Sequence, residues 1–103
     1  MSALSGRVLD IDLSSGKSSE LSIPSSVFEM YLGGRGIGAR MLFDMLPAKV
    51  DPLSEDNLLV FLTGPLSGTK VPGSSKFVVV TKSPLTQAWC DSYSSGRLSI
   101  ELR

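Results

Sequence analysis

The sequence predicts an α+β fold whose strands pair mostly antiparallel. Strand-like segments stand on both sides of one helical stretch, and that stretch is interrupted by glycines. The later strands are separated by loops rich in Gly, Pro and Ser, so the regular strand–helix alternation of a parallel sheet is absent. A chain of 103 residues fits one domain or a piece of one.

The chain begins with a predicted β-hairpin. Between residues 7 and 13, Leu9, Ile11 and Leu13 fall on one face, and the two aspartates between them point away. This alternation predicts a strand that is buried on the leucine and isoleucine face. Residues 14–17 read as a turn, and residues 18–23 read as the returning strand.

A helix interrupted by glycines is expected next. Ser26 and Glu29 have the spacing of a capping box, which would start the helix. The glycines of residues 33–39 should break it, since each costs roughly 1 kcal/mol relative to alanine. Arg40–Leu46 then resumes the helical pattern until Pro47.

The segment Gly34–Ala39 matches the dinucleotide-binding pattern G-x-G-x-x-[G/A]. That pattern is meaningful where it follows a strand and opens a helix, whereas here it follows a segment that is itself helical. The interpretation we favour is close approach, in which the glycines allow a sheet or a ligand to lie near the helix backbone.

Two strongly apolar strands, Leu58–Thr63 and Phe77–Thr81, are expected to be covered on both faces. Residues 64–76 connect them in a loop of small residues. A third strand, Gln87–Cys90, leads into the serine-rich residues 92–96. Rigid strands that present two such loops suit a backbone-lined site for an anionic or polar ligand, although ordinary hairpin turns have the same composition.

The composition excludes several classes of function. With no histidine and one cysteine, the chain can build neither a Ser-His-Asp triad nor a zinc or iron–sulfur site of its own. Cys90 is expected to be a small buried hydrophobe. Zero net charge argues against nucleic acid, so a bound anion would depend on Lys70, Lys76 or Lys82 and on backbone N–H groups.

The composition also bears on the location of the protein. No apolar run is long enough to cross a membrane, and residues 1–6 lack the features of a signal peptide. Together with the single cysteine, this predicts a cytoplasmic protein. Residues 98–103 form a periodic segment without a terminator, which is typical of an element that continues.

Four strings in the sequence carry a resemblance to a known family. They are LGGRG at residues 32–36, VDPLS at residues 50–54, GPLSGT at residues 64–69 and VTKSPLT at residues 80–86. In this order and spacing, nearly the whole chain resembles the first half of the N-terminal, pterin-binding domain of the tungsten-containing aldehyde ferredoxin oxidoreductases. We therefore treat residues 1–103 as a single partial domain.

The resemblance implies a fold and an activity. The domain is built from two similar halves, each with three strands, a helix and three strands. The enzymes oxidise aldehydes to carboxylic acids, and ferredoxin accepts the electrons. Their cofactors are a tungsten held by two pterins, a magnesium ion that joins the pterins, and a four-iron 4Fe-4S cluster. The cluster cysteines and the catalytic groups belong to later domains, so we expect this chain alone to be inactive.

The resemblance also implies site residues. Lys76 stands where the family has an arginine that contacts a pterin phosphate. Tyr93 stands where a backbone carbonyl binds the magnesium ion. Ser94, Ser95 and Gly96 take the place of the loop that meets the cofactor. Ser99 replaces a later glycine of the same region.

An alternative is a stand-alone, non-catalytic binding or interaction module with the same fold. Under either interpretation we expect this chain to form a homo-oligomer. Its two central strands are apolar on both faces, and one helix can cover only one face of a sheet, so a second copy could cover the other.

Overall fold

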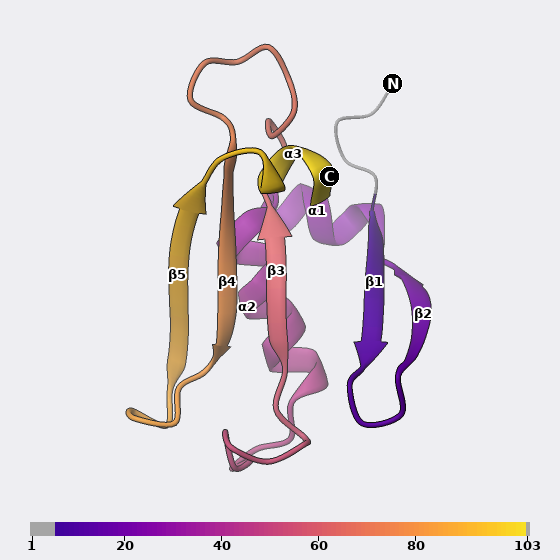
Figure 1. Cartoon of the computed structure of the whole chain (residues 1–103), viewed down its shortest axis with the longest axis vertical. Helices are drawn as coiled ribbons and strands as arrows, with labels where there is room; N and C mark the ends of the chain where they lie inside the picture. Colours follow the sequence, from indigo (N-terminus) through magenta and orange to yellow (C-terminus); the bar gives the residue numbers. More distant parts are fainter. Residues whose placement is uncertain (1–5, 103) are drawn as a thin grey trace.

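The computed structural model describes residues 6–102, which fold into two antiparallel sheets and three helices (Figure 1). Residues 1–5 and Arg103 lie outside this range, and with them most of the N-terminal segment that was examined for signal-peptide features. The predicted α+β class is therefore confirmed. The elements in order are β1 (Arg7–Asp12), β2 (Lys17–Ser22), α1 (Ser25–Tyr31), α2 (Gly34–Met45), β3 (Leu59–Thr63), β4 (Lys76–Lys82), β5 (Trp89–Ser95) and α3 (Leu98–Leu102).

The hairpin forms as predicted, but its buried face is the other one. β1 and β2 pair antiparallel, with Val8 opposite Leu21. Val8 is half-buried and borders a shallow hollow that Val27 and Met41 of the helices also line. The face expected to be buried is exposed, with Leu9 at 67% and Leu13 at 91%. Alternation shows which residues share a face, but not which face another element covers.

The glycine run separates two helices rather than interrupting one. Leu32 has φ 65°, and the N–H of Gly33 donates to the Tyr31 carbonyl oxygen over 2.7 Å, which is a γ-turn. α2 then begins at Gly34, well before the predicted resumption at Arg40. The predicted capping box is also wrong, since α1 begins at Ser25 after Pro24 without a side-chain cap.

The glycines inside α2 allow the helix to lie close to the sheet, as predicted. A Cβ atom on Gly38 would lie 2.8 Å from Leu62 Cδ1 and 2.9 Å from Val80 Cγ2, which is too close for real atoms. The cost of glycine in a helix is therefore offset by a tight contact with β3 and β4.

The second sheet has the order β3-β4-β5 with antiparallel pairing throughout. Its third strand runs from Trp89 to Ser95, later than the predicted Gln87–Cys90. The Ser83 N–H donates to the Ala88 carbonyl over 2.8 Å, so Gln87 lies in a tight turn with φ 63°. The hydrogen bonds between paired strands are made by backbone groups, which serine has like any other residue. The serines after Cys90 therefore continue the pairing with β4 as far as Ser95.

α2 covers one face of this sheet, and the core lies between them. Val78 and Val80 of β4 are fully buried against Leu42 of α2. The prediction that both faces are covered is wrong for residues 6–102, since Leu59 and Phe61 are 62% and 47% exposed. α2 lies behind the three strands, whereas α3 lies in front of the sheet at the upper end of β3 and contacts both β3 and β4 (Figure 1).

Cys90 is exposed, which corrects the prediction of a small buried residue. It lies on β5, directly opposite Thr81 of β4, at the edge of the sheet that no further strand covers in residues 6–102. None of the helices in this range has the length and apolarity that crossing a membrane requires.

Candidate functional site

A cleft of about 410 Å³ opens where the N-terminal end of α2 faces the adjoining ends of β4 and β5. Four parts of the chain meet there: the glycine run before and within α2, the end of β3 with the loop after it, the first residues of β4, and Tyr93 of β5. Its lining residues are Leu32, Gly33, Gly34, Arg35, Gly36, Leu62, Gly64, Pro65, Leu66, Ser67, Ser74, Lys76, Phe77, Val78 and Tyr93.

Lys76 and Tyr93 share the face of the sheet that α2 covers. Successive side chains of a strand point to opposite faces, so Lys76 points to the same side as the buried Val78. Tyr93 is the direct partner of Val78 across the β4–β5 pair. The lysine and the tyrosine therefore approach each other from neighbouring strands and both line the cleft.

The Lys76 ammonium is available to a ligand. Its side chain is exposed at the rim of the cleft. In the part of the chain that the structure describes, the ion pairs join Arg35 to Asp91, Arg40 to Asp44 and Arg97 to Glu101, and Lys76 takes part in none of them.

The backbone of Tyr93 points to the free edge of the sheet. The Gly96 N–H donates to the Ser75 carbonyl over 3.0 Å, and the Ser83 N–H donates to Ala88 in the same ladder. Pairs in an antiparallel ladder alternate between bonded and non-bonded, so the Val78–Tyr93 pair is non-bonded. The Tyr93 carbonyl therefore points outward from β5, where no strand pairs with it in residues 6–102.

Ser67 fixes the loop that leads into Lys76. Its side chain is only 1% exposed. Its Oγ lies 3.0 Å from the Ser74 carbonyl oxygen and 3.2 Å from the Lys76 carbonyl oxygen. One buried hydroxyl thus ties the start of the loop to its end, and this holds the first residue of β4 in place.

The four remaining predicted residues take different positions. Ser95 is the direct partner of Lys76 and lies on the same face. Gly96 follows with φ 122°, a conformation that favours glycine. Ser99 is fully buried, and its Oγ donates to the Gly96 carbonyl over 2.8 Å, so its side chain supports the turn from behind. Ser94 points to the opposite face, away from the cleft.

Arg35 is a cleft residue to which sequence reasoning assigned no role. It lies in the first turn of α2, and its Nη1 is 3.4 Å from Asp91 Oδ2 of β5. This ion pair joins the two walls of the cleft, although 63% of the arginine side chain is exposed. The sequence signal that could have identified it is its position inside the glycine pattern of residues 34–39, where a charged side chain stands at the start of the helix.

The side chains give no metal centre by themselves. Within residues 6–102, no group of three or more His, Cys, Asp and Glu side chains lies close enough together to hold an ion. A cation that touched this region would therefore depend on backbone oxygens such as the Tyr93 carbonyl.

Comparisons with known proteins identify the family. Residues 8–103 match the model of the aldehyde ferredoxin oxidoreductase N-terminal domain. The chain is 38% identical over 98 residues to the tungsten-containing aldehyde ferredoxin oxidoreductase of Pyrococcus horikoshii, which covers 95% of this chain and 16% of that protein. It is 42% identical over 106 residues to the aliphatic sulfonate oxidoreductase, WOR-like subunit, of Pyrococcus furiosus, which covers 100% of this chain and 17% of that subunit.

A solved structure gives the same result. The active-site complex BamBC of benzoyl coenzyme A reductase, in complex with 1,5-dienoyl-CoA, superposes with a TM-score of 0.94 and 38% identity, over 98% of this chain and 16% of that chain. The chain thus spans about one sixth of the length of these relatives. From the family match and these identities, the chain belongs to the aldehyde ferredoxin oxidoreductase family, and its residues 8–103 match the family's N-terminal domain.

Proposed function

We propose that this chain supplies part of the pterin platform of a tungstopterin-dependent oxidoreductase. The whole enzyme would oxidise an aldehyde to a carboxylic acid and pass the electrons through a 4Fe-4S cluster to ferredoxin. The observation that carries the proposal is the cleft, which Lys76 and Tyr93 both line from the neighbouring strands β4 and β5. Lys76 offers its ammonium there, and Tyr93 offers a carbonyl that points outward from β5.

The residues of the cleft fit a phosphate-bearing pterin. A pterin phosphate needs a cation, and Lys76 presents one at the rim without an ion pair among the described residues. A flat ring system needs close approach to the backbone, and Gly33, Gly34 and Gly36 line the opposite wall. A magnesium ion prefers oxygen ligands, and the Tyr93 carbonyl lies on the outer side of β5, where no strand of residues 6–102 pairs with it.

When bound, the tungstopterin would supply the two-electron redox chemistry. The residues of this chain would bind and orient it. The Lys76 ammonium would neutralise phosphate charge as a point charge, without the paired donors of an arginine. Ser67 would hold the loop before Lys76, and the Arg35–Asp91 ion pair would keep α2 and β5 at a fixed separation.

Aldehydes are the substrate class that the relatives' names favour. The match to an aliphatic sulfonate oxidoreductase at 42% identity shows that close relatives of this domain also occur in enzymes named for another substrate. Since the chain spans about one sixth of these proteins, the substrate pocket and the ferredoxin site would lie in segments outside it.

A test uses the full-length oxidoreductase that carries this chain. Tungsten and pterin would be quantified per polypeptide, and turnover would be measured with a panel of aldehydes and with aliphatic sulfonates, using ferredoxin as acceptor. We expect about two pterins per tungsten and carboxylic acid formation from aldehydes. A protein that carries no pterin would instead favour the stand-alone interaction module, and a loaded protein that turns over only sulfonates would contradict the aldehyde assignment.

A further inference from the structure

The lining of the cleft carries two charges, and both are positive. Among the described residues that line it, Arg35 and Lys76 alone are charged, whereas the whole chain has zero net charge. No carboxylate of residues 6–102 belongs to the lining. The cleft therefore favours a ligand that offers electron-rich acceptors to two cations.

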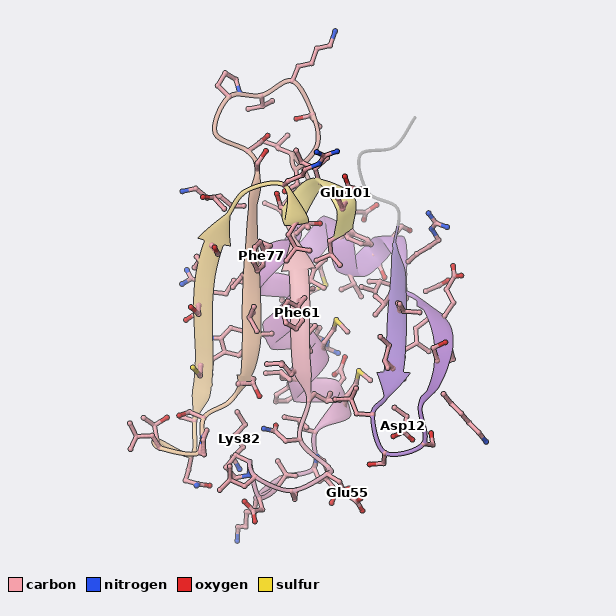
Figure 2. All side chains as sticks on the ribbon, in the orientation of Figure 1. Asp12, Glu55, Phe61, Phe77, Lys82 and Glu101 are labelled. Carbon is pink, nitrogen blue, oxygen red and sulfur yellow. The ribbon has the colours of Figure 1, made fainter. Side chains whose placement is uncertain are left out.

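The two lysines nearest in sequence to Lys76 take no part in the cleft. Lys82 lies at the lower end of β4 (Figure 2), and its Nζ donates to the Val50 carbonyl oxygen over 2.7 Å. Lys70 belongs to the loop between β3 and β4 but not to the lining. The positive charge of the cleft thus comes from one residue of α2 and one residue of β4.

Arg35 has donors that no described residue uses. A guanidinium carries five N–H donors in a planar fork. Within residues 6–102, Arg35 makes one side-chain contact, from its Nη1 to Asp91 Oδ2 over 3.4 Å. Its side chain is 63% exposed, whereas that of Asp91 is 24% exposed. The carboxylate therefore anchors the guanidinium at the wall of the cleft and leaves its other donors to a ligand.

Arg35 and Lys76 serve different ends of the cleft. Lys76 pairs with Ser95, and Asp91, which anchors Arg35, lies four residues before Ser95 on β5. That spacing puts the backbone of Asp91 about 13 Å further along the strand. Tyr93, which lines the cleft, lies between the two positions. A phosphate held by Lys76 would therefore leave Arg35 to another part of the same ligand.

The cleft has room for a flat organic ligand beside Arg35. Its volume of about 410 Å³ lies within the ~300–1,000 Å³ of pockets that hold one small molecule. Gly34 and Gly36 flank Arg35 and line the same wall, so a ring can lie against their backbone. A planar guanidinium pairs with two acceptors at once or stacks on a ring, which the ammonium of a lysine does not do.

We propose that Arg35 is a ligand-binding residue that contacts the ring system of the pterin, while Lys76 contacts its phosphate. Asp91 is the positioning residue that holds the guanidinium at the α2 wall. This inference rests on the proposed function, and it adds a contact from α2 to a platform otherwise built from the sheet.

The full-length protein that carries this chain provides the test, with the rate of pterin loss during dialysis as the measurement. Arg35→Gln should raise this rate roughly tenfold or more, which is the effect of losing a charge-assisted contact. Arg40→Gln is the matched control, because Arg40 lies on the same helix, outside the cleft lining, and pairs with Asp44. We expect it to lose pterin at the wild-type rate. Equal rates for Arg35→Gln and the wild-type protein would overturn the proposal.

An exchange of the two charges separates ligand contact from a purely structural ion pair. Arg35→Asp combined with Asp91→Arg keeps opposite charges on α2 and β5 but removes the guanidinium from the α2 wall. We expect this double variant to lose pterin at least as fast as Arg35→Gln, and Asp91→Asn alone to have a smaller effect. Wild-type retention by the exchanged pair would show that Arg35 only joins the two elements, and the proposal would fail.

A conservative variant tests the contact with the ring. Arg35→Lys keeps the positive charge and loses the planar fork, so it should still lose pterin faster than the wild-type protein. Full retention by Arg35→Lys would mean that charge alone suffices, which contradicts a contact with the ring.

Lys76→Ala separates this inference from the proposed function. A wild-type protein without pterin would overturn both. If the wild-type protein holds pterin and Lys76→Ala loses it, while Arg35→Gln retains it, the proposed function stands and the role of Arg35 is wrong. Faster loss from both variants supports the two contacts together.

Discussion

Tyr93 lies directly opposite Val78 in the antiparallel pair of β5 and β4, and the two residues exchange no backbone hydrogen bonds. One side chain of this pair is buried in the core and the other lines the cleft. The same register that packs Val78 against α2 therefore turns the Tyr93 carbonyl to the free edge of the sheet. The core and the candidate site share a single register.

The buried hydroxyl of Ser67 predicts a stability effect. Ser67→Ala leaves the Ser74 and Lys76 carbonyls without their nearby donor, so the free energy of unfolding should fall by about 1–3 kcal/mol. Chemical denaturation of the 103-residue chain at fixed protein concentration measures this. Ser19→Ala, on exposed β2, is the control and should change the value by less than about 0.5 kcal/mol. An equal effect of the two variants would argue against the loop anchor.

The close approach of α2 to the sheet predicts a second effect. Gly38→Ala should lower the free energy of unfolding by about 1–2 kcal/mol, because overpacking outweighs the gain in helix propensity. Gly64→Ala is the matched control, since a Cβ there meets no atom within 4 Å. A stabilising effect of Gly38→Ala in the same denaturation experiment would show that α2 can move away from Leu62 and Val80.

The sequence predicted the elements better than it predicted their surroundings. The hairpin, the two central strands and the α+β class follow from hydrophobic periodicity and are confirmed. Which face each strand buries does not follow, as Leu9 and Leu59 show, because burial depends on which element lies against the strand. Periodicity carries no information about that neighbour.

For the candidate site too, the sequence predicted which residues take part better than it predicted where their side chains point. The resemblance implied Lys76, Tyr93 and Ser95 as site residues, and the β4–β5 register places them side by side. Ser94 alternates to the other face, and Ser99 is buried with its hydroxyl bonded to Gly96, neither of which the composition of the loop could reveal. The prediction placed the end of β5 too early because serine has weak strand propensity, whereas the pairing with β4 decides the end of the strand.

The chain by itself should not oxidise aldehydes. Under the proposed function it would bring only part of a pterin site, and within residues 6–102 no group of three or more His, Cys, Asp and Glu side chains could hold a metal ion. We expect the purified 103-residue chain to show no turnover above background with aldehydes and an artificial electron acceptor. Turnover that follows the chain through purification would show that the catalytic groups lie within it.

The central claim, that Lys76 holds a phosphate of the pterin, is tested most directly by the pterin content of the full-length protein. Lys76→Ala should weaken pterin retention by about 1.5–3 kcal/mol, or roughly 10- to 150-fold, through the loss of a charge-assisted bond. Lys76→Arg should retain the cofactor, and Lys70→Ala, in the same loop but outside the cleft lining, should not change it. Unchanged pterin and tungsten content in Lys76→Ala, measured after equal dialysis, would contradict the account.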